Sequence, residues 1–267
     1  MRKLAYLLGI SLLAVSCQKV IDVDLNEANE NIVIEANYTG EDSTVRVHVS
    51  MTSSYFNSDP SPVVDDALVT ITDANGVSTN VPSIGNGDYE LSNYVPQYGT
   101  NYTLVVSNQG NNYTAVCDMP QPVALEPISY EYFEGFFGSE GGYAAFLNFN
   151  DPAGVENYYV AVLGENGVVY DSTNQVFTQD DALTDGNFIQ RPLFASDFFA
   201  IGDTVFMELR TVDKAIYDYT NEVQSIAGGG GGGGDSAAPG NPTTNWDNYA
   251  LGYFNAYGIS QDTVVIQ

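Results

Sequence analysis

The chain has 267 residues and a formal net charge of −27, with 7 Lys and Arg against 34 Asp and Glu. This charge argues against nucleic-acid binding, which needs a basic surface to displace counterions, and against polybasic contact with anionic lipid. Apolar residues make up 44% and aromatic residues 12% of the chain, which is typical of a globular protein. Abundant Tyr and Phe, with few long apolar helical patterns, favour an all-β fold.

The chain begins with the features of a secretory signal. Two basic residues precede an apolar run from Leu4 to Val15, which is shorter than the roughly 18–20 residues that span a bilayer. Small residues then precede Cys17, so residues 1–16 are predicted to be a signal peptide. The pattern Leu13 to Cys17 resembles a bacterial lipobox, in which the cysteine is acylated, for example with palmitate, and becomes the first mature residue. The alternative is an ordinary cleaved signal with a coincidental cysteine.

Residues 17–31 are polar and acidic and are predicted to form a lipidated tether. The 14 residues from Gln18 to Asn31 reach at most about 46–50 Å when extended. Two or more acyl chains are enough for stable attachment, so the protein would lie on a membrane with its folded part free of the lipid. Alternatively, the apolar residues between 20 and 23 add an edge strand to the first domain.

Residues 32–119 are predicted to form a β-sandwich with immunoglobulin-like or transthyretin-like proportions. The strand at 44–50 alternates cleanly, with Val45, Val47 and Val49 on one face, which is typical of a half-buried strand. The strands expected in this domain are 32–38, 44–50, 67–72, 77–81, 87–91, 101–106 and 113–117.

The prolines that follow Met119 mark a predicted domain boundary, because proline cannot donate to a sheet ladder. Residues 120–267 are predicted to form a second β-rich domain. A helix is expected near 213–227, with Asp213 as its cap, and a flexible glycine loop at 228–240. The strands expected in this domain are 128–133, 143–148, 158–163, 168–170 and 205–212.

No arrangement of residues predicts catalysis, so we expect a protein that is not an enzyme. Cys117 lies in an alternating strand and is predicted to be buried and inert. His48, the only histidine, is predicted to point outward from its strand without a ligand role.

Two segments are candidates for binding. Asp181, Asp185 and Asn187 lie around a glycine and could hold calcium, although a plain acidic loop is the favoured interpretation. Phe136 and Phe137 lie in a glycine-rich loop and are predicted to contact a partner, because aromatic side chains bury a large area at interfaces. The C-terminal aromatic residues Trp246, Tyr249 and Tyr253 are assigned mainly to the core, because Tyr249, Leu251 and Tyr253 alternate as in a strand.

Several stretches, taken in their order and spacing, resemble domain of unknown function 4249, a family of lipoproteins from Bacteroidota. They are Cys17–Leu25, Asn31–Ala36, Val63–Asp73, Asn150–Pro152 with Glu156–Tyr159, Val212–Tyr219 and Asn245–Gly258. The resemblance implies an outer-membrane lipoprotein, often encoded beside TonB-dependent outer-membrane channels, and it supplies no catalytic residues.

We therefore expect a non-catalytic accessory or binding subunit whose partner is an outer-membrane channel or another outer-membrane protein. A free-standing surface adhesin or structural module is the alternative. The acidic residues after Cys17 resemble surface-export signals of these bacteria, so we expect the cell surface, with the periplasmic face as the alternative. The triplet around Ser236 resembles an O-glycosylation acceptor of the same bacteria.

Overall fold

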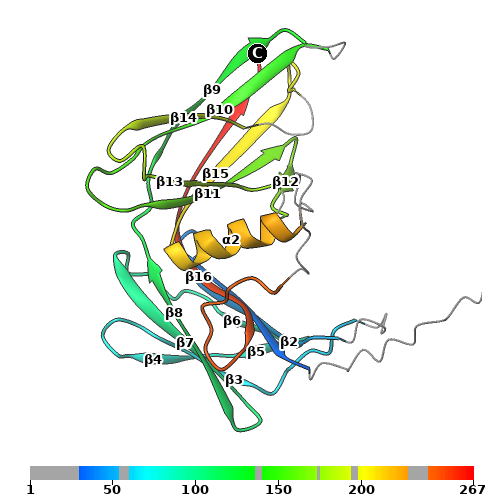
Figure 1. Ribbon diagram of the computed structural model, residues 1–267, viewed down its shortest axis with the longest axis vertical. Helices are drawn as coiled ribbons and strands as arrows, with labels where there is room; N and C mark the ends of the chain where they lie inside the picture. Colours follow the sequence, from blue (N-terminus) through cyan, green and yellow to red (C-terminus); the bar gives the residue numbers. More distant parts are fainter. Residues whose placement is uncertain (1–29, 54–59, 136–139, 173–174, 194–197, 228–239) are drawn as a thin grey trace, which may run out of the picture.

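The computed structural model describes residues 30–53, 60–135, 140–172, 175–193, 198–227 and 240–267. It is mainly β, as predicted (Figure 1). In the described part of the chain, no helix has the length and apolar character needed to cross a membrane. The strands of the first half are β1 (Ile32–Thr39), β2 (Thr44–Met51), β3 (Leu68–Thr72), β4 (Ser78–Val81), β5 (Ser83–Gly85), β6 (Asp88–Leu91), β7 (Thr100–Asn108) and β8 (Asn111–Met119).

The second half contains the remaining strands and helix α2. Their bounds are β9 (Leu125–Phe133), β10 (Gly142–Asn150), β11 (Tyr158–Glu165), β12 (Val168–Tyr170), β13 (Phe177–Asp180), β14 (Phe188–Leu193), β15 (Thr204–Val212), α2 (Lys214–Ala227) and β16 (Leu251–Val265). Of these, β13 and β14 were not anticipated from the sequence, and neither was β5 in the first half. For β16 the sequence showed only the alternation of Tyr249, Leu251 and Tyr253, not the length of the strand.

The strands form three sheets. A nine-stranded sheet runs in the order β12-β11-β15-β16-β1-β2-β6-β5, with β13 also paired to β11. A four-stranded sheet, β4-β3-β7-β8, shares a core with the β1 end, and a three-stranded sheet, β14-β10-β9, shares a core with the β15 end. The result is two sandwiches that have one sheet in common.

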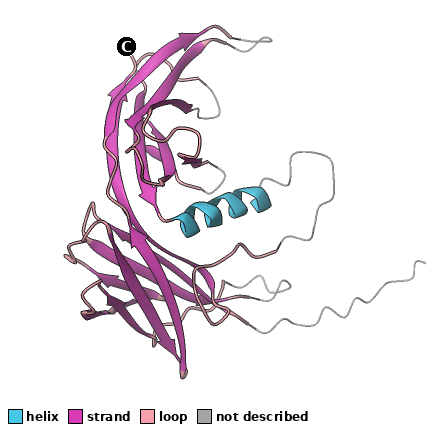
Figure 2. Cartoon of the chain, turned by 60° about the vertical axis from the view of Figure 1, so that its left-hand side comes forward, coloured by secondary structure: helices cyan, strands magenta, loops and turns pink. Residues whose placement is uncertain are grey.

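The shared sheet depends on β16, which is labelled in Figure 1 and runs through both halves of the molecule (Figure 1 and Figure 2). Its first part pairs in parallel with β1, from Leu251 opposite Val33 to Tyr257 opposite Thr39. Its second part pairs antiparallel with β15, from Gly258 opposite Thr211 to Val265 opposite Thr204. The division of the chain into two domains at residue 120 stays a prediction. β16 lies after residue 120 but pairs with strands on both sides of this division.

The first core confirms the alternation seen in the sequence. Val45, Val47 and Val49 are buried on the inner face of β2. Trp246 is also buried in this core, where its indole Nε1 donates to the backbone oxygen of Ile34 at 3.0 Å. The core assignment of Tyr249 was wrong: it precedes β16 in a turn with a positive φ, and 90% of it is exposed.

Helix α2 was predicted at nearly its observed bounds, and its cap was predicted correctly. Asp213 Oδ1 accepts the backbone N–H of Ala215 at 2.8 Å, which satisfies one of the free amides of the first turn. Asp213 Oδ2 accepts the backbone N–H of Asp118, at the end of β8, at 2.9 Å. The same carboxylate therefore begins the helix and ties it to the first sandwich.

Candidate functional site

Three carboxylates from two loops come together in the second sandwich. Oxygen atoms of Asp151, Asp181 and Asp185 all lie within 4.8 Å of one another, and we call these residues the acidic cluster. Asp151 follows β10, whereas the other two lie between β13 and β14. Asp151 and Asp181 are only 5% and 4% exposed, and none of the ion pairs formed by the described residues involves the cluster.

Backbone amides and one phenol bind the carboxylates of the acidic cluster. Asp151 accepts the N–H of Gly186 at 2.9 Å and the hydroxyl of Tyr159. Asp181 accepts the N–H of Asn157 at 2.8 Å, and Asp185 accepts the N–H of Gly154 at 2.6 Å. These bonds join the loop between β10 and β11 to the loop between β13 and β14.

The structure brings together only part of the predicted calcium set. Asp181 and Asp185 do lie side by side, but the side chain of Asn187 donates to the backbone oxygen of Asp185 at 3.3 Å. Asn187 instead contributes its backbone oxygen, which accepts the N–H of Asp151 at 3.0 Å. Sequence reasoning missed Asp151, although it lies in the stretch Asn150–Pro152 that carries part of the family resemblance. Carboxylate oxygens suit calcium, and the calcium assignment stays a prediction.

Replacing Asp181 with Ala is expected to lower the free energy of unfolding by about 1–3 kcal/mol, because the buried amide of Asn157 loses its acceptor. Urea unfolding measures this, with Leu183→Ala, 96% exposed in the same loop, as the control that should change little. The measurement is made in EDTA and in excess calcium. A calcium-dependent gain in the unchanged protein that Asp181→Ala lacks would confirm the calcium prediction, and identical midpoints would contradict it.

A cavity of about 640 Å³ lies where the two sandwiches meet, and we call it the junction cavity. Its walls come from the start of β7, from the segment 118–124 that links β8 to β9, and from the loop between β10 and β11. The linking segment is held in place by two side chains, because Val123 N–H donates to Thr211 Oγ1 at 3.2 Å and Leu125 N–H donates to Ser260 Oγ at 2.9 Å.

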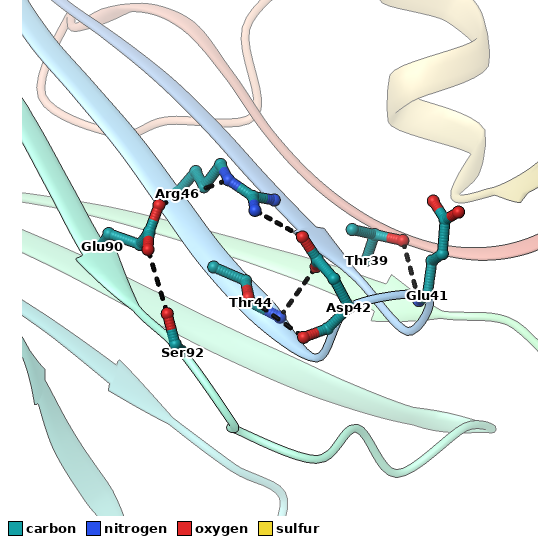
Figure 3. A network of polar contacts seen from close by, with 7 residues as sticks. All are labelled: Thr39, Glu41, Asp42, Thr44, Arg46, Glu90 and Ser92. Carbon is teal, nitrogen blue, oxygen red and sulfur yellow. Dashed lines mark hydrogen bonds and ion pairs between the residues drawn. The ribbon is translucent and has the colours of Figure 1, made fainter.

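The polar network around Arg46 closes the turn between β1 and β2 (Figure 3). Arg46 pairs with Asp42 and also lies 3.5 Å from Glu90, which accepts the hydroxyl of Ser92 at 3.0 Å. Burial acts to raise the pKa of Asp42, but the hydrogen bond and charge of Arg46 outweigh it and hold that pKa below its usual value. Half-exposed ion pairs of this kind contribute about 0–1 kcal/mol to stability. The network therefore has a small structural role at this turn.

The structure shows the surroundings of His48 and Cys117, the two residues that were considered for nucleophilic catalysis. His48 points outward, as predicted, but its Nδ1 lies 2.7 Å from Asp88 Oδ1, a partner that the sequence did not indicate. Cys117 is fully buried, as predicted, and its Sγ accepts the N–H of Ala256 at 3.2 Å. Burial raises the pKa of this thiol, so the reactive thiolate is disfavoured.

The hairpin of β9 and β10 carries a cluster of aromatic side chains. Tyr143 makes edge-on contacts with Tyr130 and Tyr132, with ring centroids 5.7 and 5.4 Å apart. Phe133 stacks on Phe198 with centroids 6.1 Å apart, while Tyr132 remains 58% exposed. We call these residues the aromatic hairpin, and the loop at its end contains the predicted contact residues. Cys17, Phe136, Phe137 and Ser236 lie outside the described residues.

Two β-sandwiches with one shared strand place the chain among the mainly β proteins. It belongs to the family described as domain of unknown function (DUF4249), whose family model matches residues 18–263. No curated protein matches the sequence.

Similar solved structures include a cytokine receptor complex, with 9% identity and a TM-score of 0.28. The match covers 69% of this chain and 86% of the receptor-complex chain. Another is a segment of two fibronectin type-III domains from chicken tenascin, with 14% identity and a TM-score of 0.23. It covers 68% of this chain and 91% of that one.

Proposed function

We propose that the protein is an outer-membrane lipoprotein, anchored through Cys17 and facing the cell surface, that acts as a non-catalytic binding subunit of an outer-membrane channel system. The observation that carries the proposal is the lipobox-like pattern that ends at Cys17 in a chain of this family. Several acyl chains on one cysteine are enough to hold a protein on a membrane stably.

The described residues support a binding role in two ways. The aromatic hairpin presents the exposed side chain of Tyr132, which precedes the predicted contact residues Phe136 and Phe137 by four and five positions in the sequence. Large aromatic side chains with a polar tip are favoured at protein interfaces. The burial of Cys117 disfavours attack by its thiol, so binding needs no chemistry from this residue.

Replacing Cys17 with Ala is expected to move the protein from the membrane fraction to the soluble fraction, because the acyl chains are lost. Fractionation of cells that express either form measures this, and metabolic labelling with a fatty acid shows whether the unchanged protein carries lipid. Membrane attachment that survives Cys17→Ala would contradict the anchor.

Affinity purification in detergent tests the partner. A co-purifying outer-membrane channel that is also captured with Cys17→Ala in the same extract would support recognition by the folded part. A protein that purifies alone in both forms would count against the channel and in favour of a free-standing adhesin or structural module.

A further inference from the structure

We propose that the junction cavity binds an organic ammonium ion that carries an apolar group. The first argument is its size and wall chemistry. Small-molecule sites commonly have volumes of about 300–1,000 Å³, apolar walls and a few placed polar groups, and the junction cavity, at about 640 Å³, lies within this range. Its apolar wall consists of Met119, Pro120, Pro122, Val123, Pro152 and Val155.

The charged groups in the lining of the junction cavity all have the same sign. Asp118 comes from the end of β8. Glu156 comes from the loop before β11 and also accepts the hydroxyl of Tyr158, and none of the described Lys, Arg or His residues lines the cavity. The helix cap Asp213 binds the backbone of Asp118 and adds another carboxylate nearby. Lys214 lies next to this cap and close enough to Glu156 to interact with its charge, but its Nζ pairs with Asp218 at 2.6 Å. The lining therefore favours a cation.

The lining of the junction cavity also includes a residue, Asn157, whose buried side-chain oxygen has no hydrogen-bond donor among the described residues. Asn157 is only 8% exposed, and its side-chain Oδ1 has no hydrogen-bond partner among the described residues. Its backbone N–H is already used by Asp181, at 2.8 Å, which holds the residue in place. Leaving a buried carbonyl oxygen unpaired costs about 1–3 kcal/mol. The oxygen lies below the cavity surface, so an ammonium N–H would reach it once the Asn157 side chain turns toward the cavity.

The net charge of the whole chain acts in the same direction. At −27, the protein attracts cations and repels anions over distances set by the ionic strength. Because the walls come from both sandwiches, a bound ligand would also contact both of them. The proposal concerns the folded part alone, so it does not depend on the lipid anchor or on a channel partner.

The test uses phenethylammonium as the probe, with 2-phenylethanol and 3-phenylpropanoate as neutral and anionic analogues that share its ring. Binding to the purified protein is measured by calorimetry and by shifts of backbone amide resonances. We expect the ammonium to bind more tightly than either analogue, with shifts at residues 99–101, 118–124 and 150–157. Equal affinity for the anion, shifts confined to other residues, or no binding of the ammonium would overturn the proposal.

Two matched variants locate the site. Val155 is 55% exposed at the cavity, so Val155→Arg should fold and should weaken ammonium binding about tenfold or more by placing a cation there, whereas Val155→Gln should not. Glu156→Gln should also weaken binding, and Glu131→Gln removes one exposed carboxylate outside the cavity as its control. Unchanged binding by Val155→Arg would place the ligand elsewhere and overturn the proposal.

Discussion

A fragment of residues 30–122, which contains strands β1 to β8, is expected not to fold on its own. The fragment lacks Trp246, Phe254 and Ala256, all of which are buried in the first core. Removing a buried Trp or Phe side chain typically costs about 3–5 kcal/mol. The two aromatic side chains alone would therefore remove an amount comparable to the whole stability of a domain, about 5–15 kcal/mol.

Loss of the shared strand also uncovers β1. In the intact chain β1 has β2 on one side and β16 on the other, in register from Val33 to Thr39. Without β16, the backbone groups of this edge would be unpaired beside an open core. Such an edge favours aggregation over folding, so we expect an insoluble or unfolded fragment rather than a weakly stable one.

The matched comparison is the same fragment fused to residues 243–258. A flexible linker of about 12 residues would join residue 122 to residue 243, and the added segment restores Trp246 and the part of β16 that pairs with β1. The fragment and the fused form are then compared by circular dichroism and by urea unfolding. We expect a cooperative transition only for the fused form. A cooperative transition of equal midpoint in residues 30–122 alone would contradict this and would support a domain boundary near residue 120.

Strands with a simple alternation could be predicted from the sequence, because each side of such a strand faces one environment. β2 is the clearest case, since its valines face the core and Arg46 is exposed. The sequence of β16 has no such pattern, because most residues from Gly252 to Tyr257 are buried and its two partners differ. Strands buried on both sides lack the period of two. Its partner β1 is also more than 200 residues away.

The candidate sites were harder to predict for a related reason. The loop with Asp181 and Asp185 could be found because its acids are neighbours in sequence, but Asp151 joins them only through the packing of two loops. The junction cavity depends on three separate segments and on the unpaired oxygen of Asn157. Neither the burial of that oxygen nor the meeting of the segments leaves a pattern in the sequence.

Replacing Gly252 with Ala is expected to destabilise the protein by at least about 3 kcal/mol. Gly252 has a φ of +93°, where a side chain is strained, and strain of this kind costs about 1–3 kcal/mol. The added Cβ would also lie 2.2 Å from the backbone oxygen of Ile34 and 2.8 Å from its carbonyl carbon. Since Ile34 is fully buried in β1 and its oxygen also accepts the indole N–H of Trp246, this backbone cannot move without disturbing the core.

Gly76→Ala is the control that separates the cost of a positive φ from the cost of the contact between the added Cβ and the backbone of Ile34. Gly76 has a φ of +79° in the turn between β3 and β4, and an added Cβ would meet nothing within 4 Å. It should therefore cost about 1–2 kcal/mol, the cost of the left-handed backbone alone. Urea unfolding of the two variants measures the difference. If Gly252→Ala were no less stable than Gly76→Ala, the close approach of β16 to the backbone of Ile34 would not contribute to the stability of the protein.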